Sequence, residues 1–169
     1  MIRQAQTKDL LAVAGIFKEL ISQAQKLGTE LFSEDPGTLL TGVLESIILM
    51  MNDLNGIILI DENERGEITG MIAGAIRSYP RFYRHTLVGE IEAAHPVSFA
   101  SARLYEAFDT WRAGKGATIT TGYVFPGNAV VLKAFERHGM KICQHWITGS
   151  FKEKKCTMMN LETAGSSVA

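Results

Sequence analysis

The chain has 169 residues, and its 17 lysines and arginines against 18 aspartates and glutamates give a formal net charge of -1. A general nucleic-acid binder needs a strong excess of basic residues, so this balance argues against one. Hydrophobic residues make up 46% and charged residues 21% of the chain, near the average of globular domains, which argues against wholesale disorder. We expect one domain over residues 1–152, followed by a tail over residues 153–169.

Signals for export, membrane insertion or metal binding are not found in the sequence. The longest apolar-leaning run, Val43–Met51, is far shorter than the roughly 20 residues that cross a bilayer, so no membrane segment is expected. The chain opens Met-Ile-Arg-Gln, without the apolar core of a secretion signal. Cys143 and Cys156 have neither CxxC nor zinc-site spacing, and we interpret them as reduced thiols of a cytoplasmic protein. The four histidines have no close ligand spacing, so no metal is expected.

Helical patterns dominate the first third of the chain. Ile2–Gln6 is a candidate strand, and Thr7 is expected to cap a helix whose apolar residues recur every three or four positions. Asp35 and Pro36 suit the cap and the first position of a second helix with the same periodicity. Two amphipathic helices are therefore predicted before the first long strand.

Strand-like patterns follow. Gly56–Ile60 and Glu67–Ile76 predict an antiparallel hairpin, and Thr86–Ala94 predicts the next strand. Strict alternation along that strand would place Leu87, Gly89, Ile91 and Ala93 on one face and Val88, Glu90, Glu92 and Ala94 on the other. We therefore expect both glutamates of this strand to share a face.

The second half of the chain alternates helices with strands. The expected elements are a helix capped by Ser98 and closed near Gly114, a strand Ala117–Val124, a helix capped by Asn128 and ended by Gly139, and two final strands, Lys141–Trp146 and Ile147–Lys152. Taken together, the order predicts an α/β or α+β fold: a single domain with a mixed, mostly antiparallel sheet flanked by helices.

Three short stretches occur in the order of one known family's motifs. The chain opens Ile2-Arg3-Gln4-Ala5 followed by Thr7-Lys8-Asp9-Leu10, the second arm of the hairpin begins Glu67-Ile68-Thr69-Gly70, and a late stretch runs from Asn128-Ala129 to Lys133–Met140. In order and spacing, over residues 1–152, these stretches resemble the GNAT-type N-acetyltransferase superfamily. The resemblance implies a single GNAT-like domain.

The resemblance also implies an activity and a site. It implies an acetyl-CoA-dependent N-acetyltransferase that transfers an acetyl group to a small-molecule or peptide amine. Glu90 or Glu92 would take the proton of the amine, and Tyr123 could serve as the acid. Acetyl-CoA would lie between the ends of the strands Thr86–Ala94 and Ala117–Val124. It would contact Ala93, Ala94, Ser98, Phe99, Ala100, Ser101, Ala102, Asn128 and Phe135.

Two features depart from the family pattern. The family has Q/R-x-x-G-x-G/A before its third helix, where backbone amides face the pyrophosphate of coenzyme A, but Ala94–Arg103 contains no glycine. Many members protonate the departing thiolate with a tyrosine on the fourth helix, and Phe135 takes that position here. Both departures bear on whether the chain is an active enzyme.

Each candidate also has a structural interpretation. Glu90 and Glu92 could lie on a solvated strand face, Tyr123 could be a half-buried packing residue, and Asn128 could be a helix cap. The departures also fit a second class of function: a catalytically inactive GNAT-like structural or adaptor protein with a protein partner, for example one encoded by a bacteriophage. Binding of acetyl-CoA would separate the two classes.

The stretch from Arg77 to Arg84 interleaves arginines with aromatic residues. Such a pattern could stack on bases or bind an acidic partner. A solvated linker is the simpler interpretation, and no nucleic acid is expected to bind.

Overall fold

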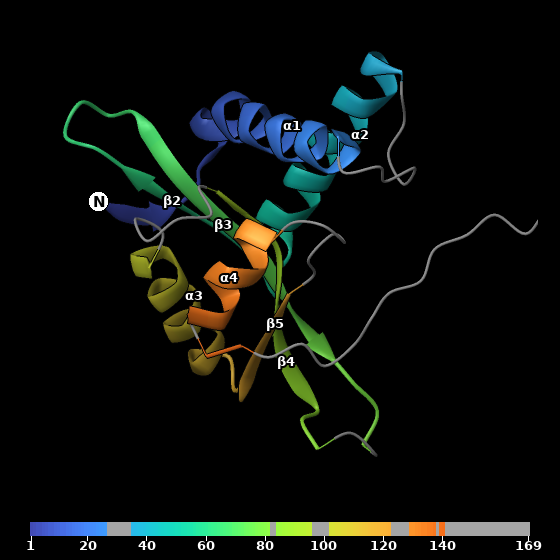
Figure 1. The fold of residues 1–169 in the computed structure, drawn as a ribbon, viewed down its shortest axis with the longest axis vertical. Coiled ribbons are helices and arrows are strands. Elements are labelled where there is room, and N and C mark those ends of the chain that lie inside the picture. Colours follow the sequence, from blue (N-terminus) through green and yellow to red (C-terminus); the bar gives the residue numbers. More distant parts are fainter. Residues whose placement is uncertain (27–34, 82–83, 96–101, 123–128, 138, 141–169) are drawn as a thin grey trace, which may run out of the picture.

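A computed structural model describes residues 1–26, 35–81, 84–95, 102–122, 129–137 and 139–140 (Figure 1). The elements are β1 (Ile2–Gln4), the 3-10 turn η1 (Thr7–Asp9), α1 (Leu10–Lys26), α2 (Pro36–Asn52), β2 (Gly56–Glu62), β3 (Ile68–Ser78), β4 (Leu87–His95), α3 (Ala102–Gly114), β5 (Ile119–Gly122) and α4 (Ala129–Arg137). This is the predicted order as far as α4. The expected strands Lys141–Trp146 and Ile147–Lys152, the caps Ser98 and Asn128, and the tail lie outside the described residues.

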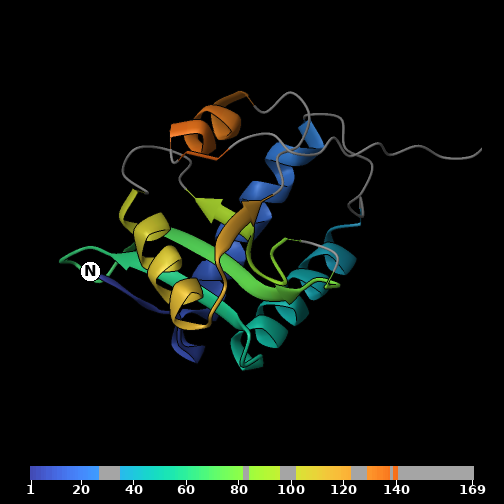
Figure 2. The same ribbon diagram turned by 90° about the horizontal axis from the view of Figure 1, so that it is seen from below.

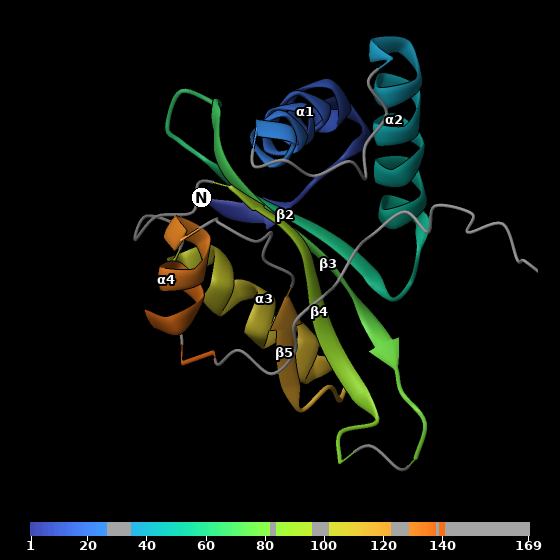
Figure 3. The ribbon, with the colours of Figure 1, turned by 45° about the vertical axis from the view of Figure 1, so that its right-hand side comes forward.

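The described strands form one sheet in the order β1-β2-β3-β4-β5. Neighbouring strands are antiparallel except β4 and β5, which are parallel. Helices α1 and α2 cover one face, and α3 and α4 cover the other (Figure 3). Figure 2 shows the strands between α3 on one side and α2 on the other. The predicted mixed, mostly antiparallel sheet flanked by helices is therefore confirmed.

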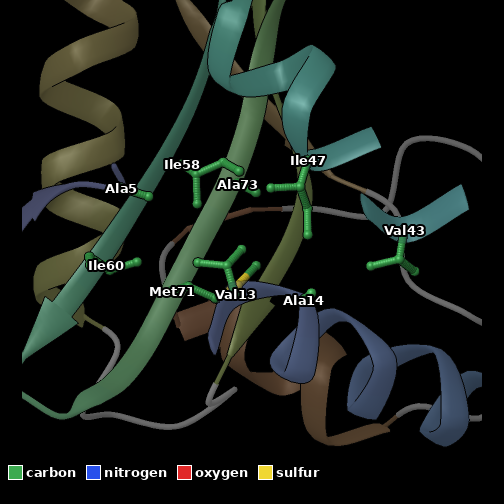
Figure 4. Close-up of a cluster of buried hydrophobic side chains, with 9 residues drawn as sticks. All are labelled: Ala5, Val13, Ala14, Val43, Ile47, Ile58, Ile60, Met71 and Ala73. Carbon is green, nitrogen blue, oxygen red and sulfur yellow. The ribbon is translucent and has the colours of Figure 1, made fainter. Parts of the chain in front are cut away.

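The first face of the sheet is closed by an aliphatic layer (Figure 4). Val13 of α1 and Ile47 of α2 are completely buried against β2 and β3, where Ile60 and Met71 are equally buried. Burying one such side chain stabilises a fold by about 1.5–3 kcal/mol. The layer fixes both helices to the β2–β3 hairpin, and β4 takes its register from that hairpin.

An ion cluster attaches β1 to the start of α1. The Arg3 guanidinium donates to both carboxylate oxygens of Asp9, at 2.7 and 3.0 Å, and also to Glu62 of β2. Asp9 additionally accepts the backbone N–H of Gln6 at 2.8 Å. The N-cap is therefore Gln6 and not Thr7 as predicted, because Thr7 already belongs to the turn that opens the helix.

This cluster predicts acid-sensitive stability. Hydrogen bonds from Arg3 lower the pKa of Asp9 from its usual 3.8 to about 2. A carboxylate with a lower pKa in the folded state stabilises the fold above its usual pKa, and this contribution is lost as the pH falls from the usual value to the folded one. Asp9→Asn should therefore cost about 2 kcal/mol at neutral pH. Urea unfolding of both proteins should show this gap shrinking towards about pH 2; an equal gap at every pH would contradict it.

Candidate active site

The ladder between β4 and β5 is short. It runs from the pair Val88–Ile119 to the pair Ile91–Gly122. Beyond Ile91, β4 continues to His95 and, within the described part of the chain, is paired there with β3 alone. Backbone amides and carbonyls along a strand need hydrogen-bond partners, so this edge of β4 suits an extended ligand that contains amide groups.

A β-bulge lies where the ladder ends. Gly74 of β3 pairs with Ile91, and the residue before Gly74 pairs with Ala93, so Glu92 is an extra residue in β4. The predicted alternation is therefore wrong beyond Ile91. Ile91 and Ala94 both pack on the side of α3, whereas Ala93 packs on the side of α1 and α2. The two alanines predicted to contact the acyl donor thus face opposite sides of the sheet.

Both candidate bases contact one arginine. Arg77 of β3 approaches Oε1 of Glu90 with its Nε at 3.6 Å, and its terminal nitrogen pairs with Glu92. The hydroxyl of Tyr79 donates to the other oxygen of Glu90 at 3.4 Å. The expectation of a solvated linker is wrong for Arg77 and Ser78, because β3 extends to Ser78.

Burial separates the two glutamates. Glu90 is buried, with 8% of its surface exposed, whereas Glu92 at the bulge is exposed. A solvated strand face therefore describes Glu92 but not Glu90. A general base works best within hydrogen-bond reach of the reacting group and away from competing water, so Glu90 is the better placed candidate.

Phe135 of α4 lies on the opposite face of the same strand ends. It is buried and packs edge-to-face against Tyr105 of α3, with ring centroids 5.8 Å apart. Its Cζ lies 3.2 Å from the position that a Cβ of Gly122 would occupy, so the ring covers the end of β5. Burial raises the pKa of Tyr105 to about 12. α4 is described as far as Arg137, and Gly139, the predicted stop, follows two residues later with a φ of 76°.

The remaining predicted site residues are placed only in part. Ala102 is the first residue of α3 and is half-buried. The other candidates lie outside the described residues: Tyr123, Ser98, Phe99, Ala100, Ser101 and Asn128. Among the residues that the structure describes, no three histidines, cysteines, aspartates or glutamates are grouped so that they could hold a metal ion. No helix in the same part of the chain is long and apolar enough to cross a membrane.

Comparison with known proteins identifies the fold. No family model and no curated protein sequence matches the chain. A variant of the BH1408 protein from Bacillus halodurans superposes with a TM-score of 0.75 at 14% identity, covering 90% of this chain and 99% of that one. Aminoglycoside 6'-N-acetyltransferase AAC(6')-IG from Acinetobacter haemolyticus gives 0.69 at 14%, covering 90% and 98%.

A third solved structure is aminoglycoside N-acetyltransferase AAC(6')-Iy in complex with CoA. It superposes with a TM-score of 0.68 at 20% identity, covering 92% of this chain and 95% of that one. The described elements thus have the fold of the GNAT acetyltransferases, as the sequence motifs predicted. At this level of identity the likeness concerns the fold alone.

Proposed function

We propose that the protein is an acetyl-CoA-dependent N-acetyltransferase that acts on a small-molecule or peptide amine. The observation that supports this most directly is the position of Glu90. This shielded carboxylate lies one residue before the point at which β4 loses its β5 partner. A base therefore lies next to a strand edge whose backbone N–H and C=O groups have no strand partner on the β5 side among the described residues.

The strand edge fits the amide-containing arm of coenzyme A. Residues from Glu92 to His95 have no strand partner on the β5 side among the described residues, and the side chains of Ala93 and Ala94 are small enough to permit close approach. Phe135 would cover the arm from the side of α4. The start of α3 at Ala102, with residues 98–101 and Asn128, is proposed to hold the rest of the molecule. AAC(6')-Iy, which has the same fold, was solved in complex with CoA.

In the proposed reaction, Glu90, Arg77 and the residues near the thiol would each have a separate role. Acetyl-CoA, when bound, supplies the acetyl group and leaves as the thiol. Glu90 accepts the proton that the amine nitrogen loses as its bond to the acetyl carbon forms. Arg77 holds the side chains of both glutamates in place through its two contacts. Phe135 has no proton to give, so the proton of the thiol would come from Tyr123 or from water.

Ligand binding tests the proposal. Acetyl-CoA at a hundred times its dissociation constant should add about 2.7 kcal/mol to the free energy of unfolding, seen as a rise in Tm. ADP is the matched control, because it carries a pyrophosphate but no pantetheine arm for the β4 edge. Release of free thiol should then be followed with a panel of amines.

The opposite result supports the second function. Phe135 and the segment Ala94–Arg103, which has no glycine, are the observations that favour an inactive structural or adaptor protein. No stabilisation by acetyl-CoA, together with no thiol release from any amine, would remove the enzyme proposal and leave the adaptor. Equal stabilisation by ADP would show binding that does not use the edge of β4.

A further inference from the structure

A buried hydroxyl beside Glu90 has no hydrogen-bond partner among the described residues. The Oγ1 atom of Thr121 in β5 is shielded from solvent and has no hydrogen-bond partner in the part of the chain that the structure describes. Buried polar groups are nearly always hydrogen-bonded, because leaving one unpaired costs about 1–3 kcal/mol. An unpaired buried hydroxyl in a native fold therefore calls for an explanation, and one explanation is a ligand.

The register of the sheet places this hydroxyl on the side of Glu90. Thr121 is the direct partner of Glu90 in the parallel ladder, so their side chains lie on the same face. Its neighbour Thr120 points the other way, because its hydroxyl bonds to Arg112 and Asp109 of α3. Neighbouring strands are about 4.8 Å apart, so one nitrogen atom can reach both a residue of β4 and its partner on β5.

We infer that the hydroxyl of Thr121 is a positioning group of the acceptor site, accepting a hydrogen bond from the amine whose proton Glu90 takes. The inference rests on the proposed function. A primary amine has two N–H bonds and one lone pair. With one N–H directed at Glu90 and the other at Thr121, the lone pair is left free to point away from both residues. As the new N–C bond forms, the proton on the first N–H passes to the carboxylate and the second N–H stays on the amide product.

The first test needs no ligand and compares two neighbouring threonines. Thr121→Val keeps the shape of the side chain and removes a hydroxyl that has no partner in the described part of the chain, so its Tm should equal or exceed that of the wild type. Thr120→Val is the matched control and should lower the Tm, because it breaks the bonds to Arg112 and Asp109. A loss for Thr121→Val as large as that for Thr120→Val would show that the hydroxyl has a structural partner, and would overturn the inference.

The second test measures binding of a simple cation by NMR. Methylammonium chloride should shift the signals of Thr121 and Glu90, whereas trimethylammonium has one N–H and cannot reach both. Thr121→Val should weaken methylammonium binding roughly tenfold, and Thr121→Ser should restore it.

The outcomes distinguish the two proposals. A shift at Glu90 that is equal in wild type and Thr121→Val would overturn the role of Thr121 and leave the proposed function intact. Methylammonium that shifts neither residue would contradict the acceptor site itself. Binding that Thr121→Val weakens and Thr121→Ser restores would support both.

Discussion

Gly74→Ala is expected to destabilise the protein by about 3 kcal/mol or more and to lower its Tm by roughly 10 °C. A Cβ at this position would lie 2.2 Å from the backbone carbonyl oxygen of Glu90 and 2.8 Å from the ring of Phe108. The first atom belongs to the backbone of β4 and the second to the completely buried side chain of Phe108. Neither atom can move away from the new Cβ without disturbing the sheet or the packed core. Thermal unfolding of the variant measures the loss.

Gly42→Ala provides a control of opposite sign. Gly42 lies in the interior of α2, and a Cβ there would meet no atom within 4 Å. Alanine should therefore stabilise the helix by about 0.5–1 kcal/mol. If Gly74→Ala were as stable as the wild type, β3 and β4 would not approach each other at the bulge as closely as described.

The fold was predictable because most of its signals are local. The spacing of apolar residues located α1 and α2, and Asp35 caps α2 as expected by accepting the backbone N–H of Thr38 at 2.7 Å. Turn residues between apolar runs located the β2–β3 hairpin. Helix periodicity and turn chemistry depend on neighbours in the chain, so a single sequence is sufficient to find them.

The site was only partly predictable because it depends on pairing between strands. Glu90 and Glu92 were found, but the bulge at Glu92 arises from the register of β4 against β3, and no residue type in β4 marks it. The contacts of Arg77 depend on the same register, which is why a linker was predicted where β3 continues. The hydroxyl of Thr121, which has no hydrogen-bond partner among the described residues, is a feature of the packed sheet that no residue type in β5 marks.

Glu90→Gln is expected to slow acetyl transfer by 10²- to 10⁴-fold, the usual value of general base catalysis. Glutamine keeps the size of the side chain and can still accept a hydrogen bond from Tyr79, but it cannot take up the proton of the amine. Stabilisation by acetyl-CoA should be unchanged, because the proposed binding edge begins beyond this residue. The rate is measured as thiol release with the best amine of the panel.

Glu92→Gln is the matched comparison for this variant. Glu92 lies on the same strand and contacts the same Arg77, but it is exposed to water at the bulge. A carboxylate in water gains little as a base over the solvent around it, so this variant should lose less than about tenfold. Equal losses in both variants would show that the pair acts through Arg77 and that neither glutamate is the base. A larger loss for Glu92→Gln would show that Glu92, at the bulge, is the base. The amine would then approach β4 beside Ala93.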